Sequence, residues 1–225
     1  MKKQHKQRIL SIVLICTLLS YATVSVASAE QVSLQTVQLS APIYNANRPV
    51  QTTVLTPVAS GKAVKSGSGA TIDYSNCNEG YVMVKYTGSC SKVKLQITGS
   101  NKVTYTYVLK PHDYQTFPLT SGDGNYTVNV FENVSGNQYA LALGHTVSVK
   151  LKSSLLPYLY PNQYVDFNAQ SATVAKGAEL AANAADEIAV VTNVYNYVTS
   201  NITYDQQKAL SVTSGYLPVV DTILA

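Results

Sequence analysis

Cysteine and histidine are the residues in this chain that are best suited to nucleophilic chemistry. Beyond residue 30 the sequence holds two cysteines, Cys77 and Cys90, and two histidines, His112 and His145. A thiolate activated by an imidazole attacks carbonyl carbon, so a Cys–His pair would support acyl transfer or peptide hydrolysis. No local pattern marks an activated thiol. We therefore expect two small packing residues and two surface histidines.

Adjacent carboxylates are the next candidates for chemistry. Asp186 and Glu187 precede a helical pattern, and negative charge is stabilised at the N-terminal end of a helix. We interpret them as a helix-start charge pair and not as a general acid/base dyad. The spacing of His, Cys and Asp matches no metal site, and the Gly-rich turns lack a phosphate-loop pattern. The sequence assigns no catalytic, cofactor-binding or metal-binding residue.

The first 29 residues have the three parts of a secretory signal peptide. Lys2, Lys3, Lys6 and Arg8 form a positive segment, residues 9–26 are mostly apolar, and Ala27-Ser28-Ala29 is an A-x-A cleavage site. We expect cleavage before Glu30 and an extracellular or cell-surface protein.

Two alternatives to cleavage before Glu30 are an uncleaved membrane anchor and, because of Cys16, a lipoprotein. The small residues at the cleavage site argue against the anchor. Ile15 argues against the lipoprotein, since a small residue is needed before the lipidated cysteine.

The positive charge of the chain belongs to this leader. The formal net charge is +4, from 16 Lys and Arg against 12 Asp and Glu, and four of the cations precede residue 9. Residues 30–225 are therefore formally neutral, which points away from nucleic acid as a partner. No later stretch is long and apolar enough to span a bilayer. A cell-wall component or an extracellular protein is the expected partner, and the oligomeric state is left open.

Cys77 and Cys90, the two cysteines after the leader, could form a disulfide in an oxidising compartment. The pattern between them predicts a strand over residues 81–86, which would hold its ends roughly 20 Å apart. A disulfide needs Cα atoms within about 7 Å. We favour two free thiols over a disulfide.

Residues 30–69, rich in Ser, Thr, Pro and Gly, are expected to be a mostly disordered linker.

Apolar residues at every second position indicate a β domain over residues 70–152. Turn sequences separate seven short predicted strands, an arrangement typical of an immunoglobulin-like β-sandwich. The strands are expected at residues 70–74, 80–86, 92–98, 103–109, 114–119, 125–131 and 138–150. Asp123-Gly124-Asn125-Tyr126 fits either a tyrosine corner or an ordinary hairpin turn followed by a buried tyrosine.

A connector and helices follow the sandwich. Residues 153–170 combine prolines with aromatic residues, so we expect an ordered connector in a groove, with its aromatics buried. Ser171 is expected to cap a helix over residues 172–182, and Asn183 a second helix to about residue 200. Ile188, Val191, Tyr195 and Val198 would line one face of that second helix.

The last third of the chain resembles transglutaminase-like domains. Residues 194–205, Val-Tyr-Asn-Tyr-Val-Thr-Ser-Asn-Ile-Thr-Tyr-Asp, look like the opening helix of these domains. Residues 214–218, Ser-Gly-Tyr-Leu-Pro, and residues 220–224, Val-Asp-Thr-Ile-Leu, resemble the segment just before their catalytic cysteine. The connector sequence at 159–167 is similar to that of secreted bacterial members, which carry a β-sandwich in front.

The resemblance covers roughly residues 70–225 and implies a cysteine acyltransferase or peptidase. Members use a cysteine in a "G.C..Ya" stretch, then a histidine and an aspartate. No residue here matches these three positions, so residues 171–225 are expected to be the incomplete N-terminal helices of such a domain. The alternative is a non-enzymatic adhesion module, whose Tyr-rich sandwich binds cell wall or protein.

Overall fold

The computed structural model describes residues 53–224 apart from residue 214. The chain divides into two units, residues 1–44 and 45–225, and every described residue belongs to the second. The expected signal peptide, and the expected linker up to residue 52, lie outside the described residues.

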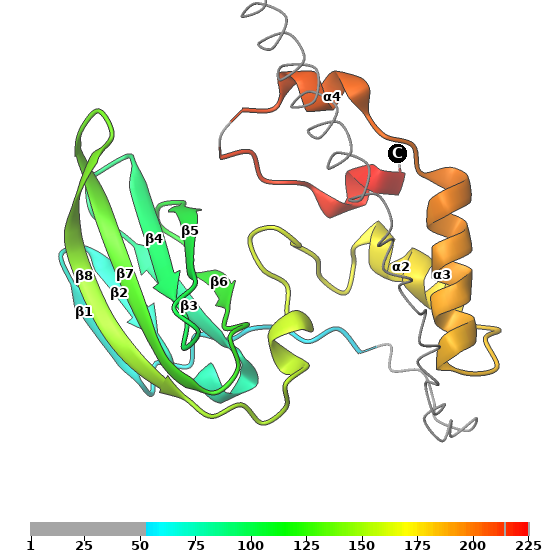
Figure 1. The fold of residues 1–225 in the computed structure, drawn as a ribbon, viewed down its shortest axis with the longest axis horizontal. Helices are drawn as coiled ribbons and strands as arrows, with labels where there is room; N and C mark the ends of the chain where they lie inside the picture. The colour runs from blue at the N-terminus through cyan, green and yellow to red at the C-terminus, as the bar shows by residue number, and fades with distance from the viewer. Residues whose placement is uncertain (1–52, 214, 225) are drawn as a thin grey trace, which may run out of the picture. The chain divides into compact units, whose positions relative to one another are not determined.

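The fold is mainly β, as the sequence predicts (Figure 1). The strands form two antiparallel sheets of four strands each. One sheet has the order β1-β2-β3-β6 and the other the order β5-β4-β7-β8. The strands are β1 (Val64–Gly67), β2 (Ala70–Asp73), β3 (Tyr81–Tyr86), β4 (Val93–Thr98), β5 (Thr104–Leu109), β6 (Gln115–Pro118), β7 (Gly124–Ser135) and β8 (Gln138–Val149). Seven of them match the predicted strands to within a few residues.

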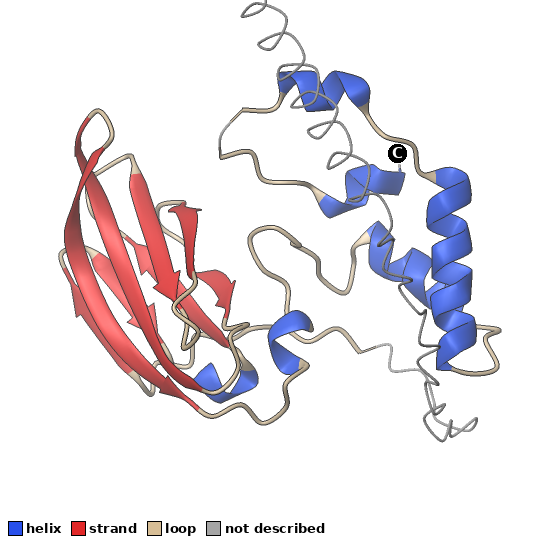
Figure 2. Cartoon of the chain, viewed as in Figure 1, coloured by secondary structure: helices blue, strands red, loops and turns tan. Residues whose placement is uncertain are grey.

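The strands of both sheets, drawn in red in Figure 2, contribute side chains to one hydrophobic core. Along β4 the residues alternate between buried and half-buried, with Val93, Leu95 and Ile97 pointing inward. This alternation is what places one face of a strand against a core. Between the sheets, the rings of Tyr107 on β5 and Phe117 on β6 lie 5.0 Å apart, centroid to centroid.

The predicted linker is wrong at its C-terminal end, because residues 64–67 form β1. The Ser-Gly sequence there is a tight hairpin turn: Ser68 and Gly69 both have positive φ, of 47° and 71°, and join β1 to β2. Positive φ at both central residues is the signature of the two-residue turn that matches strand twist. A Cβ on Gly69 would lie 2.7 Å from the backbone of Gly88, so the turn needs glycine.

Ordered backbone also precedes β1. The buried carboxylate of Asp73 accepts hydrogen bonds from Gly61 N (2.7 Å) and Ser75 N (2.9 Å). The Tyr81 hydroxyl accepts one from Val58 N at 3.1 Å. These contacts hold residues 58–63 against the first sheet, so the boundary of the ordered domain lies well before residue 70.

Tyr126 forms the backbone contact expected of a tyrosine corner. Its hydroxyl donates to the carbonyl of Gly122 at 2.8 Å, and its ring is fully buried near the start of β7. The alternative of a plain hairpin turn is wrong, since β6 and β7 lie in different sheets and the turn between them closes no hairpin.

The connector is ordered, but none of its four aromatics is fully buried: Tyr160 and Phe167 are half-buried, and Tyr158 and Tyr164 are exposed. It contains the 3-10 helix η2 (Leu156–Tyr158), and Pro157 is buried against Gly80. Tyr160 stacks on Tyr81 with centroids 4.6 Å apart. Tyr158 and Tyr164 remain about half exposed or more, contrary to expectation.

The helical segment contains α2 (Ala172–Ala181), α3 (Glu187–Asn201), α4 (Gln206–Ser211) and the 3-10 helix η3 (Val220–Leu224). Ser171 occupies the N-cap position of α2 as predicted, but its side chain makes no capping hydrogen bond. The predicted cap Asn183 is wrong, since Asp186 caps α3 and accepts from Ala189 N at 2.8 Å. Helix α4 was not predicted from the sequence; Asp205 caps it by accepting from Lys208 N at 2.8 Å. No helix in residues 53–224 is long and apolar enough to cross a membrane.

Candidate functional site

The two thiols lie at opposite ends of β3 and are free. Cys77 begins the 3-10 helix η1 (Cys77–Glu79), and its Sγ faces the carbonyl of Ser148 at 4.0 Å. Burial raises the pKa of the Cys77 thiol, which disfavours the reactive thiolate. The sequence prediction of free thiols is confirmed.

Cys90 is held by the backbone of neighbouring strands. Its Sγ lies 3.3 Å from the carbonyl of Lys92 and 3.7 Å from that of Asn133. Its N–H donates to the Tyr86 hydroxyl, which in turn donates to the carboxylate of Glu132. These contacts join the loop that carries Cys90 to β3 and β7.

The contacts of the histidines are with tyrosines and not with the thiols. His145 on β8 lies against the ring of Tyr74 at 4.7 Å. His112 follows β5 with a φ of 79°, and its N–H donates to the carbonyl of Tyr86 at 2.7 Å. Within the described part of the chain, no hydrogen bond joins a thiol to an imidazole. The structure therefore does not assemble a Cys–His pair.

The remaining titratable candidates, Asp186 and Glu187, lie at the start of α3. Asp186 caps α3 and Glu187 is the first residue of that helix, which agrees with a helix-start role. Among residues 53–213 and 215–224, no cluster of three or more His, Cys, Asp or Glu side chains is arranged to hold a metal ion.

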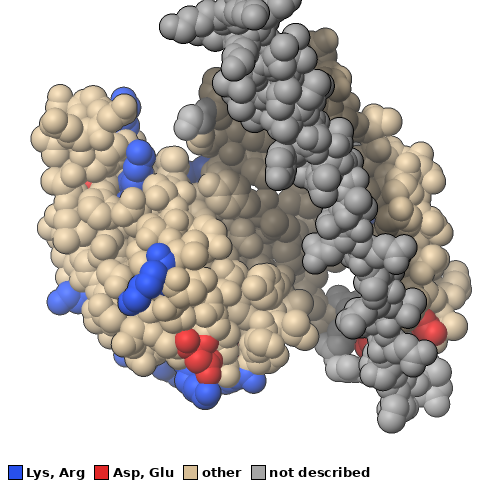
Figure 3. All heavy atoms as spheres, in the orientation of Figure 1, with Lys and Arg blue, Asp and Glu red and all other residues tan. Residues whose placement is uncertain are grey.

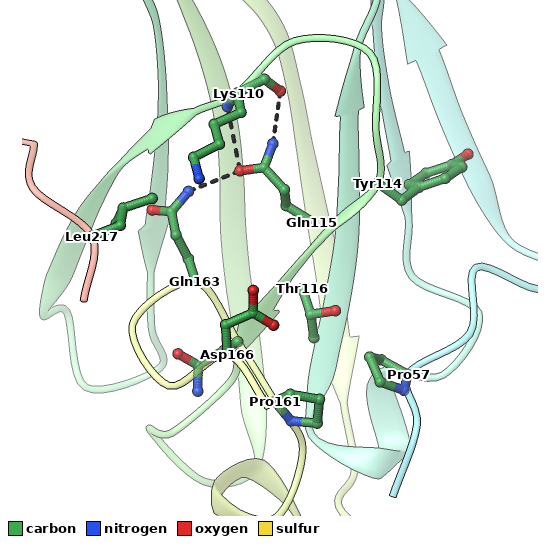
Figure 4. Close-up of a pocket in the computed structure, with 10 residues that line it drawn as sticks. Pro57, Lys110, Tyr114, Gln115, Thr116, Pro161, Gln163, Asp166 and Leu217 are labelled. Atoms are coloured by element: carbon green, nitrogen blue, oxygen red, sulfur yellow. Dashed lines mark hydrogen bonds between the residues drawn. The ribbon is translucent and has the colours of Figure 1, made fainter. Parts of the chain in front are cut away.

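An amide network forms a small polar pocket that the sequence did not reveal (Figure 4). Gln163 of the connector donates from Nε2 to Val108 O (2.6 Å) and to Gln115 Oε1 (2.8 Å). Gln115 donates to Lys110 O at 2.7 Å. The buried Oε1 of Gln163 has no hydrogen-bond partner in the described structure. No sequence signal links two glutamines 48 positions apart.

This pocket is too small to hold more than a compact polar group. Its volume is about 180 Å³, and Lys110 and Asp166 place opposite charges on its lining. Sites for drug-sized ligands measure about 300–1,000 Å³. We interpret the network as the contact that fixes the connector to β5, to β6 and to the loop that joins these two strands.

A larger groove lies beside it, lined mainly by tyrosines. Its volume is about 480 Å³, and β5, the residues that end and follow β6, and the connector all contribute. The lining residues are Tyr105, Thr106, Tyr107, Pro118, Thr120, Tyr158 and Tyr164. None of these side chains carries a formal charge at neutral pH. The Tyr-rich composition was a sequence signal for such a surface, but not for its position.

The helix α3 presents an uncovered apolar face. No residue of α3 is buried, and the predicted stripe is exposed along its whole length. The exposed fractions are 57% for Ile188, 67% for Val191, 66% for Tyr195 and 43% for Val198. A continuous apolar stripe of this kind marks a surface that another element or partner covers.

Comparison of the sequence with protein-family models finds no match. Comparison with curated proteins finds no match either.

Proposed function

We propose that this chain is the N-terminal, non-catalytic portion of a secreted transglutaminase-like cysteine acyltransferase or peptidase. The observation that carries the proposal is the exposed stripe of α3, at the position where the sequence resembles the opening helix of such domains. In a complete domain the stripe would pack on a sheet and on a later helix bearing the nucleophile.

The energy at stake explains why the stripe needs a partner. Burying an apolar side chain contributes about 1.5–3 kcal/mol, so four such residues forgo roughly 6–12 kcal/mol while they face water. That is comparable to the stability of a whole small domain. An isolated helix of this length is marginal in water.

The strand order supports an immunoglobulin-type sandwich in front of these helices. In the strand lettering used for immunoglobulin domains, β2, β3 and β6 correspond to strands A, B and E. The other sheet, β5-β4-β7-β8, takes the places of C′, C, F and G. Tyr126 then lies at the E–F corner, where such domains place their tyrosine corner. β1 is an added strand at the edge.

The test uses the natural secreted protein that contains residues 70–152. Incorporation of a primary amine into a glutamine-donor protein is measured before and after alkylation with iodoacetamide. We expect alkylation-sensitive activity that survives in a C77S/C90S variant, because the nucleophile lies outside the described residues. Absence of activity, or its loss in C77S/C90S, would overturn the proposal.

A second candidate is a binding module without catalysis. The observation in its favour is the tyrosine groove, which is open, uncharged and built on the rigid sandwich. In this case the secreted protein would show no amine incorporation but would still bind a surface ligand.

A further inference from the structure

The four tyrosines of the groove have hydroxyl groups without hydrogen-bond partners among the described residues. Elsewhere in the sandwich and connector, the hydroxyls of Tyr81, Tyr86, Tyr126 and Tyr160 are hydrogen-bonded. Those of Tyr74, Tyr114 and Tyr139 also lack a partner among the described residues, but these three tyrosines are not gathered around one groove. Of the groove's hydroxyls, that of Thr106 alone has a partner within the described part of the chain: it accepts from the Nε2 of Gln96 at 3.3 Å. The groove therefore presents polar groups that its own fold leaves unused.

Tyr107 forms a rigid floor for the groove. It is only 7% exposed, and its ring is held between Phe117 at 5.0 Å and Tyr164 at 5.9 Å. Burial, with the neighbouring Tyr164 and Tyr105, raises the pKa of Tyr107 to about 12. Its hydroxyl therefore stays protonated and able to donate at any physiological pH.

The walls of the groove are aromatic and accessible. Tyr105, Tyr158 and Tyr164 are 47%, 64% and 45% exposed, so their rings are open to a ligand. Surface charge is sparse in this protein, and the face drawn in Figure 3 carries only scattered Lys, Arg, Asp and Glu side chains. A ligand matched to this lining is neutral, because no charged side chain would compensate a buried charge.

We propose that the tyrosine groove binds a neutral carbohydrate chain. The face of an aromatic ring is electron-rich and attracts the polarised C–H groups on the flat face of a pyranose ring. The hydroxyls at the edge of that sugar ring both donate and accept hydrogen bonds, as do those of Tyr and Thr. Six of the seven lining residues carry a hydroxyl. The groove can therefore contact both the flat face of a sugar, through the tyrosine rings, and the hydroxyls at its edge, through the side-chain hydroxyls.

A proline-rich peptide fits this lining less completely. Aromatic grooves do bind such peptides, and peptide carbonyls would accept from the tyrosine hydroxyls. Proline has no N–H, however, so the threonine and tyrosine lone pairs would find few donors. The inference rests on the sandwich and connector alone, and it stands whether or not the transglutaminase-like proposal holds.

The test titrates residues 30–225 with chitohexaose and with cellohexaose, two neutral β-linked hexasaccharides, by calorimetry. Tyrosine emission gives a second readout, because the chain has no Trp. We expect saturable binding of at least one sugar. Removing one stacking ring in Y105A or in Y164A should weaken it by about threefold to tenfold. Y105F keeps the ring and should lose less.

Y139A is the matched control, because Tyr139 lies on β8, at the opposite edge of the same sheet. It should leave sugar binding unchanged, and thermal unfolding should show that all variants are folded. Absence of binding of either sugar at millimolar concentration would overturn the proposal. An equal loss in Y139A would also overturn it, as would binding of a proline decamer in place of both sugars with the same dependence on Tyr105.

Discussion

The carboxylate of Asp221 caps the N-terminus of α2 by accepting two hydrogen bonds from Thr173. The distances to its Oδ1 are 3.0 Å from Thr173 N and 2.8 Å from Thr173 Oγ1. Ser171, at the N-cap position, makes no side-chain cap, because its hydroxyl accepts from Asn168 N instead. An aspartate 48 residues away therefore supplies the capping oxygen, and η3 is tied to α2.

This cap should weaken in acid. Hydrogen bonds from the backbone and side chain of Thr173 lower the pKa of Asp221. A lowered folded-state pKa means that the stabilisation is present above the unfolded value of about 3.9 and is lost as pH falls through the folded value. The amide shift of Thr173, followed by NMR, should titrate below pH 3.9 and stop titrating in D221N. A D166N control should leave that titration unchanged, and a Thr173 shift insensitive to D221N would contradict the cap.

Removing the Tyr126 hydroxyl should destabilise the sandwich. Y126F deletes the bond to Gly122 O and leaves that carbonyl without its partner at the corner, which costs about 0.5–1.5 kcal/mol. Urea unfolding measures the change. Y105F removes a hydroxyl without a hydrogen-bond partner in the described structure and should change stability far less; equal effects would show that the corner is not stabilising.

Residues 30–225 should contain two alkylatable thiols. Cys77 and Cys90 are free in the structure, at either end of β3. Alkylation under denaturing, non-reducing conditions, followed by mass spectrometry, should add two labels. A protein that takes none would carry a disulfide and would contradict the placement of β3 between them.

Core and helix-face residues should respond differently to truncation. L95A empties a fully buried site and should cost about 2–5 kcal/mol. V191A alters an exposed residue of α3 and should change the free energy of unfolding by no more than about 0.5 kcal/mol. Urea unfolding measures both changes.

Amide hydrogen exchange should be slow across residues 80–150 and fast across residues 172–224. Equal protection in both regions of a monomer would show that the helical segment is already a complete unit.

Secreted protein should begin at Glu30. Cleavage after Ala29 follows from the small residues at positions 27 and 29. Edman sequencing of material from the culture medium checks this. Retention of the leader, or a start at another residue, would contradict the prediction.

The sheets could be predicted because period-two alternation is local. The alternation of Val93, Leu95 and Ile97 with polar residues is enough to show which face of the strand is buried. Glycine-containing turns mark where the strands end. β1 escaped prediction because its four residues are all exposed and its Ser-Gly turn has the composition of a flexible linker. What fixes β1 is pairing with β2, a contact that no four-residue pattern encodes.

The candidate sites depend on contacts between distant residues, and these were not predictable. Prolines and aromatics marked the connector as ordered, but burial was assumed for Tyr158 and Tyr164, which instead form open walls. The Gln115–Gln163 bond has no local signature, since any polar side chain could sit at either position. By contrast, the apolar stripe of α3 could be predicted from the sequence, because residues three and four positions apart lie on the same face of a helix.

The hairpin of β1 and β2 determines how the domain yields to mechanical load. β1 pairs only with β2, and its first residue, Val64, lies opposite Asp73 at the open end of the hairpin. Tension applied upstream would first break the bonds of residues 58–63 to Asp73 and Tyr81. It would then peel β1 away one hydrogen bond at a time. The core lies in the seven remaining strands. We therefore expect β1 to detach and extend under load while those strands stay folded.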